Sequence, residues 1–164
     1  MAWELLGYTK LGSAQNTITV AGFTAKKFLC VEISTPGASN AGVRTRLRFN
    51  SDTGSNYADR ASNNGSSDST NTSQSFVYVA ESDSQEGELD VIYIINIEDE
   101  EKLVINQNVR SSATGAGTAP SRYNGVGKWT NTLAQITTID VFAHPTDTAD
   151  KYDADSEVTV YGTD

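Results

Sequence analysis

The feature of this sequence that most constrains its fold is a two-residue alternation of apolar and polar side chains, repeated in short segments along the chain. Successive side chains of a β-strand point to opposite faces, so this period predicts strands with one buried face. The segment 43–49 shows it most sharply, because Val43, Leu47 and Phe49 fall on one side and arginines on the other. The pattern predicts strands at 17–21, 27–33, 43–49, 75–80, 89–97, 102–108, 134–143 and 157–161, with a further strand near 3–9.

The segment 89–97 differs from the others because it is apolar on both sides. Leu89, Val91 and Tyr93 alternate there with Ile92 and Ile94. Apolar side chains on both faces are typical of a central strand, or of a strand that is covered on both sides. We therefore expect 89–97 to lie at the centre of a sheet.

Composition argues against a helical bundle. The 164 residues include 17 Ser, 19 Thr and 12 Asn, 48 in all, and these residues favour turns and strands over helices. Together with the absence of a helical period, this predicts an all-β fold, an antiparallel β-sandwich and most plausibly a jelly roll of eight or nine strands. An immunoglobulin-like sandwich is the alternative, although Cys30 is the only cysteine and the cysteine pair of a true immunoglobulin domain is missing.

The length predicts one domain, 1–164, and two stretches interrupt its strands. Segment 51–73 has almost no bulky apolar side chain apart from Tyr57, and segment 110–128 is rich in Ser, Gly and Ala. Stretches of this composition bury too little area to offset the entropy of ordering them. We therefore expect two long polar loops, at 51–73 and 110–128.

Charge excludes several classes of partner. The net charge of −9 opposes nucleic-acid binding, which needs clustered Lys and Arg. No apolar run reaches the roughly 18 to 20 residues that cross a bilayer, so we expect no membrane contact. Residues 1–10 lack the basic start and continuous apolar stretch of a signal peptide, which predicts a soluble protein made in the cytoplasm.

The sequence offers little for catalysis. His144 is the only histidine, and no Gly-x-Ser-x-Gly elbow accompanies it. Cys30 lies within a predicted strand, where nothing nearby would activate its thiol. Asp90 and Asp140 also lie within predicted strands, and an outward-facing strand carboxylate is their ordinary interpretation. No phosphate-binding glycine loop is present. We expect no enzyme activity and no cofactor.

A weak metal candidate lies in the first polar stretch. Asp52, Asn56 and Asp59 offer oxygen ligands of the kind that calcium prefers, around a glycine. They lack the full acidic series and final Glu of an EF-hand loop. A simple Asx turn is the favoured interpretation, with calcium as the alternative.

Five residues are candidates for partner binding. Arg44, Arg46 and Arg48 fall on one strand face at intervals of about 6.6 to 6.8 Å, and they repel one another unless carboxylates or a partner compensate. Cross-strand carboxylates are favoured, and an intersubunit or partner contact is the alternative. Trp3 and Trp129 are either core residues or interface anchors.

Several motifs together resemble small β-rich structural proteins of tailed viruses. Two motifs contribute most to this resemblance. One is a Phe-Asn-x-Asp-x-Gly-x-Asn-Tyr turn within 47–57 that follows the arginine-bearing strand, and the other is a last segment, 156–162, that ends in Tyr-Gly. The likeness also includes Trp-Glu-Leu-Leu-Gly at 3–7 with 17–20, and the segment 129–132 leading to 135–139. These are scaffold residues, so the resemblance transfers no catalytic site.

The resemblance implies a virion protein of the bacteriophage head or tail. The length is small for a major shell protein, so a capsid decoration or cement protein on the capsid surface is the first expectation. It would be a homo-oligomer that binds the major capsid protein or other virion proteins and stabilises the shell by bridging its subunits. A head-fibre or tail-tip domain is the alternative within the same biology.

A carbohydrate-binding module is the alternative from another class. Jelly rolls often bind sugars by aromatic stacking, and a host-surface glycan is a possible partner. Tyr123 and Trp129 are the rings that we expect to stack on a sugar in that case, provided that both are exposed.

Overall fold

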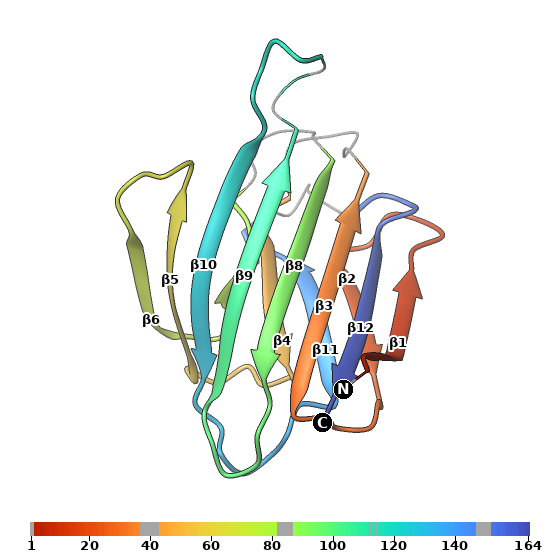
Figure 1. Ribbon diagram of the computed structural model, residues 1–164, viewed down its shortest axis with the longest axis vertical. Coiled ribbons are helices and arrows are strands. Elements are labelled where there is room, and N and C mark those ends of the chain that lie inside the picture. Colours follow the sequence, from red (N-terminus) through yellow and green to blue (C-terminus); the bar gives the residue numbers. More distant parts are fainter. Residues whose placement is uncertain (1, 37–42, 82–86, 112, 114, 147–151) are drawn as a thin grey trace.

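The structure is a computed structural model that describes residues 2–36, 43–81, 87–111, 113, 115–146 and 152–164 (Figure 1). These residues form twelve strands and no helix. The strands are β1 (Glu4–Lys10), β2 (Thr17–Ala21), β3 (Phe28–Thr35), β4 (Thr45–Phe49), β5 (Tyr57–Asn63), β6 (Ser69–Gln74), β7 (Val77–Tyr78), β8 (Glu88–Ile95), β9 (Lys102–Arg110), β10 (Ser121–Trp129), β11 (Thr138–Ala143) and β12 (Glu157–Thr163).

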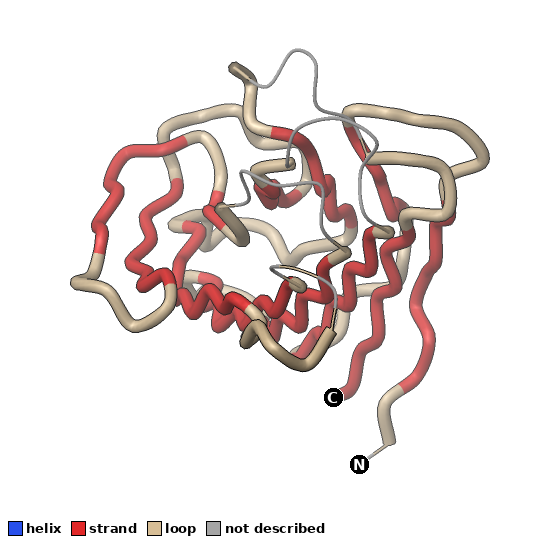
Figure 2. Tube along the Cα trace, turned by 90° about the horizontal axis from the view of Figure 1, so that it is seen from above, coloured by secondary structure: helices blue, strands red, loops and turns tan. Residues whose placement is uncertain are grey.

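The strands form two antiparallel sheets that pack face to face (Figure 2). The larger sheet has eight strands in the order β1-β12-β3-β8-β9-β10-β5-β6, and the smaller has four in the order β2-β11-β4-β7. Figure 1 views the larger sheet from its outer side, with the smaller sheet behind it. The all-β fold and the antiparallel β-sandwich are thus confirmed. The jelly-roll connection stays a prediction, and the strands outnumber the eight or nine expected.

The alternation in the sequence decides which side chains fill the space between the sheets. In β3, Leu29, Val31 and Ile33 are fully buried, and in β4 Leu47 and Phe49 are. Each such side chain contributes about 1.5 to 3 kcal/mol when removed from water. One cluster of buried residues joins the two sheets; its other members include Ile18, Val20, Val77, Val79, Ile92, Ile94, Val104, Ile136, Ile139, Val141, Val158 and Val160.

The expected loop at 51–73 is wrong, because most of it is a hairpin. Strand β5 pairs with β10, and β6 pairs with β5 as the outermost strand of the larger sheet. The core-facing positions of β5 are Tyr57, Asp59 and Ala61, and β6 buries none of its side chains. An edge strand needs little apolar burial because backbone pairing to its neighbour holds it.

The expected loop at 110–128 is also wrong, because it contains most of β10. This strand pairs along its whole length with β9 on one side, and over residues 123–129 with β5 on the other. Two glycines make it look like a loop in the sequence, but both are packing requirements. A Cβ on Gly125 would lie 2.3 Å from Oδ1 of Asn106, and one on Gly127 would lie 2.8 Å from Cγ1 of Val77.

Candidate functional site

The outer face of the larger sheet is the most unusual surface of the described residues. Strand β8 is the fourth of eight strands, so the expectation of a central position for 89–97 is confirmed. Its inner face, with Ile92 and Ile94, is buried in the core, whereas Leu89, Tyr93 and Ile95 point outward and are exposed. The apolar second face that the sequence showed is therefore in contact with solvent in the isolated chain.

The neighbouring strands continue this apolar surface. Tyr93 lies directly opposite Ile105 of β9, which lies opposite Val126 of β10. These three side chains are 52%, 56% and 51% exposed. In the next row, Ile95 lies opposite Leu103. We call this surface the outer apolar face and define it as Trp3, Leu89, Tyr93, Ile95, Leu103, Ile105, Val109 and Val126.

Trp3 joins the face from the N-terminal segment. Strand β1 is the edge strand, three positions from β8, yet the ring centroids of Trp3 and Tyr93 are only 6.4 Å apart at an interplanar angle of 58°. Figure 1 shows the reason, because the N-terminal end crosses in front of β12 towards β3. Trp3, a predicted interface anchor, is thus half exposed on this surface.

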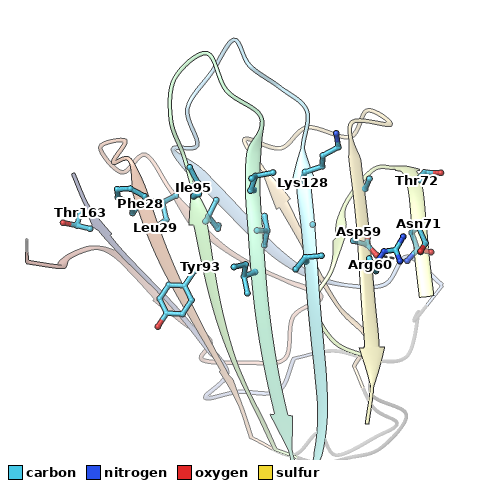
Figure 3. Close-up of a pocket in the computed structure, with 18 of the residues that line it drawn as sticks. Phe28, Leu29, Asp59, Arg60, Asn71, Thr72, Tyr93, Ile95, Lys128 and Thr163 are labelled. Carbon is cyan, nitrogen blue, oxygen red and sulfur yellow. Dashed lines mark hydrogen bonds between the residues drawn. The ribbon is translucent and has the colours of Figure 1, made fainter. Parts of the chain in front are cut away.

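A groove of about 680 Å³ runs over the outer apolar face (Figure 3). Trp3 and Phe28 line one side, and Arg60 and Thr70 line the other. Tyr93 and Lys128 project from strands between them in Figure 3. Apolar side chains line most of the groove, so it favours contact with another apolar surface over the binding of a small polar ligand.

Charged side chains also face outward on the strands that flank the outer apolar face. Acidic Glu32 and Glu157 lie on β3 and β12, while Arg60, Arg122 and Lys128 lie on β5 and β10. The register places these residues on the same outward side as Tyr93 and Ile105. Several of these charges are already compensated, because Arg60 lies 3.6 Å from Asp68 and Lys128 lies 2.7 Å from Glu101. Basic Lys10 also lies opposite Glu157 in the register of β1 and β12.

Cys30 lies in the cross-strand row that contains Tyr93 and Ile105, between Tyr161 and Tyr93. Its thiol is largely buried, and burial raises its pKa, with a smaller effect in the same direction from Glu32. A raised pKa keeps the thiol protonated and unreactive at neutral pH.

Arg46, a partner-binding candidate, is fully buried, so its assignment to an exposed partner site is wrong. Its Nη1 donates to the carbonyl oxygens of Thr45 and Ala80, and its Nη2 lies 2.7 Å from Oε1 of Glu81. The guanidinium carbon also lies 3.8 Å from the ring centroid of Tyr78. A loop carboxylate and carbonyls compensate this charge instead of the expected cross-strand carboxylates.

The other two arginines are held within the chain too. The Nη2 of Arg44 donates to Oγ1 of Thr146 at 2.8 Å. The Nε of Arg48 donates to the carbonyl oxygen of Ser75, and its guanidinium lies 4.3 Å from the ring centroid of Phe142. These arginines lie on the smaller sheet, away from the outer apolar face.

Trp129, another candidate anchor, is fully buried and is a core residue. Its ring stacks on Tyr57 at an interplanar angle of 16°, and its Nε1 donates to Oδ2 of Asp52 at 2.7 Å. Tyr123 is buried as well. The proposed sugar-stacking pair of Tyr123 and Trp129 is therefore wrong, because neither ring is accessible.

The three calcium candidates do not form one site. Oδ1 of Asp52 accepts the backbone N–H of Gly54, and Oδ2 accepts Nδ2 of Asn56, which is the Asx-type turn that was favoured. Asp59 instead faces the core, where it accepts hydrogen bonds from Nδ2 of Asn71 and the backbone N–H of Tyr78. Among the residues that the structure describes, no three acidic, His or Cys side chains gather to hold a metal ion.

The turn within 47–57 joins the two sheets. Asn50 has a positive φ of 49°, and its Oδ1 accepts the backbone N–H groups of Thr137 and Thr138. The hydroxyl of Tyr57 accepts the backbone N–H of Phe49 at 3.1 Å. The motif that carries the family resemblance is thus a structural corner between β4 and β5.

Asp90 points into the core, so the expectation of an outward-facing carboxylate is wrong for it. Its Oδ1 accepts Nδ2 of Asn108 at 2.8 Å, and its Oδ2 has no hydrogen-bond partner among the described residues. Burial raises the pKa of Asp90 well above its usual range, and the nearby Glu88 raises it further. Asp140, by contrast, accepts hydrogen bonds from Thr19 and Ser51 near the surface.

His144 packs against aromatic residues of the smaller sheet. Its ring centroid lies 5.7 Å from that of Phe76 in an edge-on arrangement, and its Nδ1 accepts the backbone N–H of Thr146. The hydroxyl of Thr146 also lies 2.7 Å from this Nδ1, so these contacts orient the ring.

No protein-family model and no curated protein matches this sequence. No described segment forms a helix that is long and apolar enough to cross a membrane. The argument for function therefore depends on the outer apolar face and on the residues that lie around it.

Proposed function

We propose that this chain is a virion structural protein, a capsid decoration or cement protein that binds the outer shell of a tailed bacteriophage and bridges its subunits. The observation that carries the proposal is the outer apolar face. The motif resemblance to structural proteins of tailed viruses supports the proposal. Virion proteins and the capsid surface are the partners and the location that follow from it.

The apolar face favours a role in permanent protein contact. A contiguous apolar patch on the surface of a soluble protein often marks an interaction site. Here the patch lies on paired strands in the middle of a sheet, so it is rigid before any partner binds. A pre-formed surface loses little entropy on binding, which suits a component that must bind in many identical copies.

Bridging then stabilises the shell by mass action. A protein that binds the assembled shell and not the separated subunits shifts the equilibrium towards assembly. The net charge of −9 keeps such a protein soluble before assembly. No catalytic step is part of this function.

The test is the composition and stability of purified particles. We expect the polypeptide at a fixed, high copy number per particle, and we expect particles without it to release their contents at lower temperature. Adding the purified chain back should restore stability, whereas the Ile105→Glu variant should not. The Leu133→Glu variant is the matched control, because Leu133 is 94% exposed but lies in the loop between β10 and β11. Absence of the chain from particles, or unchanged shell stability without it, would contradict the proposal.

Copy number separates a decoration protein from the alternatives in the same particle. A head-fibre or tail-tip domain would be present in few copies, at one vertex or at the tail. A quantitative count of the chain against the major shell protein therefore distinguishes them.

Glycan binding is a second candidate function, favoured by one observation. Trp3 and Tyr93 are both about half exposed beside the groove, and exposed aromatic rings stack on sugars. Their planes are inclined by 58°, so they do not form a flat platform. A glycan array tests this, and binding that is lost in Tyr93→Ala would favour this function over shell binding.

A further inference from the structure

We infer that the outer apolar face is covered by a second copy of this chain, in a two-fold dimer whose axis runs parallel to the strands between β8 and β9. This inference rests on the proposed function, which supplies the idea that another protein surface covers this face. It adds the identity of the partner and the geometry of the contact.

The outer side of the larger sheet is large enough for a stable dimer. Its eight strands, about 4.8 Å apart and roughly 27 Å long, present about 1,000 Å², and the outer apolar face occupies the central strands β8, β9 and β10 together with Trp3. A stable interface of ordinary size buries about 800 Å² on each partner. One sheet face of this chain therefore offers enough area for a second sheet to pack on it, as sheets do in a β-sandwich.

The rows of the sheet are self-complementary about the proposed axis. Strands β8 and β9 are the fourth and fifth of eight, so the midline of the sheet lies between them. A two-fold along this line places β8 of one copy over β9 of the other, at the same height. Residues that pair across the midline then face each other between copies. Three of these pairs are Tyr93 with Ile105, Ile95 with Leu103, and Leu89 with Val109, and all six side chains are exposed and apolar. The fourth outward pair, Val91 with Gln107, includes one polar side chain.

Charge adds one complementary pair about the same axis. The two-fold lays β3 over β10 and β12 over β5, so Glu32 of one copy lies over the strand that carries Arg122 in the other. Glu32 shares its cross-strand row with Asn124, two residues from Arg122 on the same strand. Glu32 of one copy and Arg122 of the other therefore come within reach of one another. Neither residue is in an ion pair among the described residues.

An axis perpendicular to the strands would not give this match. It would place β3 over β3 of the second copy and β10 over β10, so that Glu32 would lie over the strand that carries Glu32 and not over the strand that carries Arg122. The Glu32 and Arg122 pair therefore favours the axis parallel to the strands, since charge complementarity gives an interface its specificity.

Such a dimer would give the proposed function its bridging geometry. The two smaller sheets would lie on opposite outer sides of the dimer, related by the two-fold. Each copy would present the same surface, so one dimer could contact two equivalent shell subunits.

The first test is the mass of the purified full chain in solution by sedimentation velocity. We expect a dimer at about 100 µM, a concentration at which an interface of this size is normally occupied. Ile105→Glu should weaken the dimer by at least about 100-fold, since it puts a charge at the centre of the contact. Leu133→Glu should leave the dissociation constant within about twofold, because it lies outside the face.

The second test uses charge reversal, which does not disturb the apolar centre. Glu32→Arg alone and Arg122→Glu alone should each weaken self-association by about 10-fold, because like charges then meet twice. An equal mixture of the two variants should form a heterodimer as tightly as the original chain, because one contact is swapped and the other is unchanged.

The outcomes separate this inference from the proposed function. A monomer at about 100 µM, a trimer, or a dimer that Ile105→Glu leaves intact would overturn the inference. A monomeric chain that still binds particles would leave the proposed function standing. A dimer that is absent from particles would contradict the function and support the inference.

Discussion

The indole Nε1 of Trp129 donates a hydrogen bond of 2.7 Å to Oδ2 of Asp52, and this bond ties the end of β10 to the turn that follows β4. The same carboxylate accepts the backbone N–H of Gly54 and the side chain of Asn56. Asp52→Ala should lower the free energy of unfolding by about 2 kcal/mol, since three donors lose their acceptor. Urea unfolding followed by Trp fluorescence measures the change.

Trp129→Phe serves as a control for that prediction. It keeps a buried ring and removes the N–H donor, and it leaves a small empty volume because the Phe ring is smaller. We expect a smaller loss for it than for replacement by Ala, which costs about 3 to 5 kcal/mol for a buried Trp. Equal stability of Asp52→Ala and the original chain would show that the turn does not depend on this carboxylate.

Acid should also weaken this corner. Partial burial acts to raise the pKa of Asp52, but the hydrogen bonds from Trp129, Asn56 and Gly54 outweigh it and the pKa is lowered. A lowered pKa gives stability that is present above the unfolded value of about 3.9 and is lost as pH falls through the folded value. The pH dependence of stability below about pH 4 should therefore be less steep in Asp52→Asn than in the original chain. An unchanged acid limb would contradict this assignment.

Asp90 should have the opposite effect on stability. Burial and then Glu88 raise its pKa, so its contribution to stability is present at low pH and is lost as pH rises through the folded value. Asp90→Asn keeps an acceptor for Nδ2 of Asn108 and removes the ionisation. At pH 8 we expect the variant to be more stable by about 1 kcal/mol or more, with a flatter dependence on pH.

The exposed Glu32→Gln is the matched control for Asp90, and it should change the stability of the monomeric chain by less than about 0.5 kcal/mol. A destabilised Asp90→Asn protein with an unchanged pH profile would mean that Asp90 is not the group that titrates.

Much of the fold was predictable because burial alternates along most strands. Segment 17–21 matches β2, and 27–33 matches most of β3, since an apolar residue faces the core at every second position. The alternation fails in β10, whose core-facing positions include Gly125 and whose glycines fill contacts too tight for a Cβ. A pattern of apolar residues cannot detect a position that needs no side chain.

The candidate site was only partly predictable. The second apolar face of 89–97 favoured a central or covered strand, but the sequence could not show that this face is exposed in the isolated chain. Asp90 was recoverable, because it shares its side of the strand with Ile92 and Ile94 and must face the core with them. The burial of Arg46 could not be predicted from the sequence. It depends on contacts with Tyr78 and Glu81, which are more than thirty positions away along the chain.

Gly125→Ala tests the close packing of β10. The added Cβ would lie 2.3 Å from Oδ1 of Asn106 and 3.4 Å from Cβ of Ala61, so the buried Asn106 side chain or the strand must shift. We expect a loss of about 1 to 3 kcal/mol, as for other overpacked core positions. Gly117→Ala is the control, because nothing lies within 4 Å of its added Cβ. If both variants unfold at the same urea concentration as the original chain, the packing argument for β10 is wrong.

Arg46→Lys tests whether the buried arginine is structural. The guanidinium donates to two carbonyl oxygens and to Glu81 while lying over the ring of Tyr78, and a lysine ammonium cannot reproduce this planar set of contacts. We expect a loss of about 2 to 3 kcal/mol, because buried acceptors lose their donor. Arg60→Lys is the control. Arg60 is exposed and forms a surface ion pair with Asp68 at 3.6 Å. Exposed ion pairs contribute little to stability, so this substitution should cost less than about 0.5 kcal/mol. If Arg46 acts only inside the fold, Arg46→Lys should change the dissociation constant of self-association by no more than about twofold. The same limit holds for Arg60→Lys, because lysine keeps the positive charge. Unchanged stability of Arg46→Lys with weakened self-association would return Arg46 to the list of partner-binding residues.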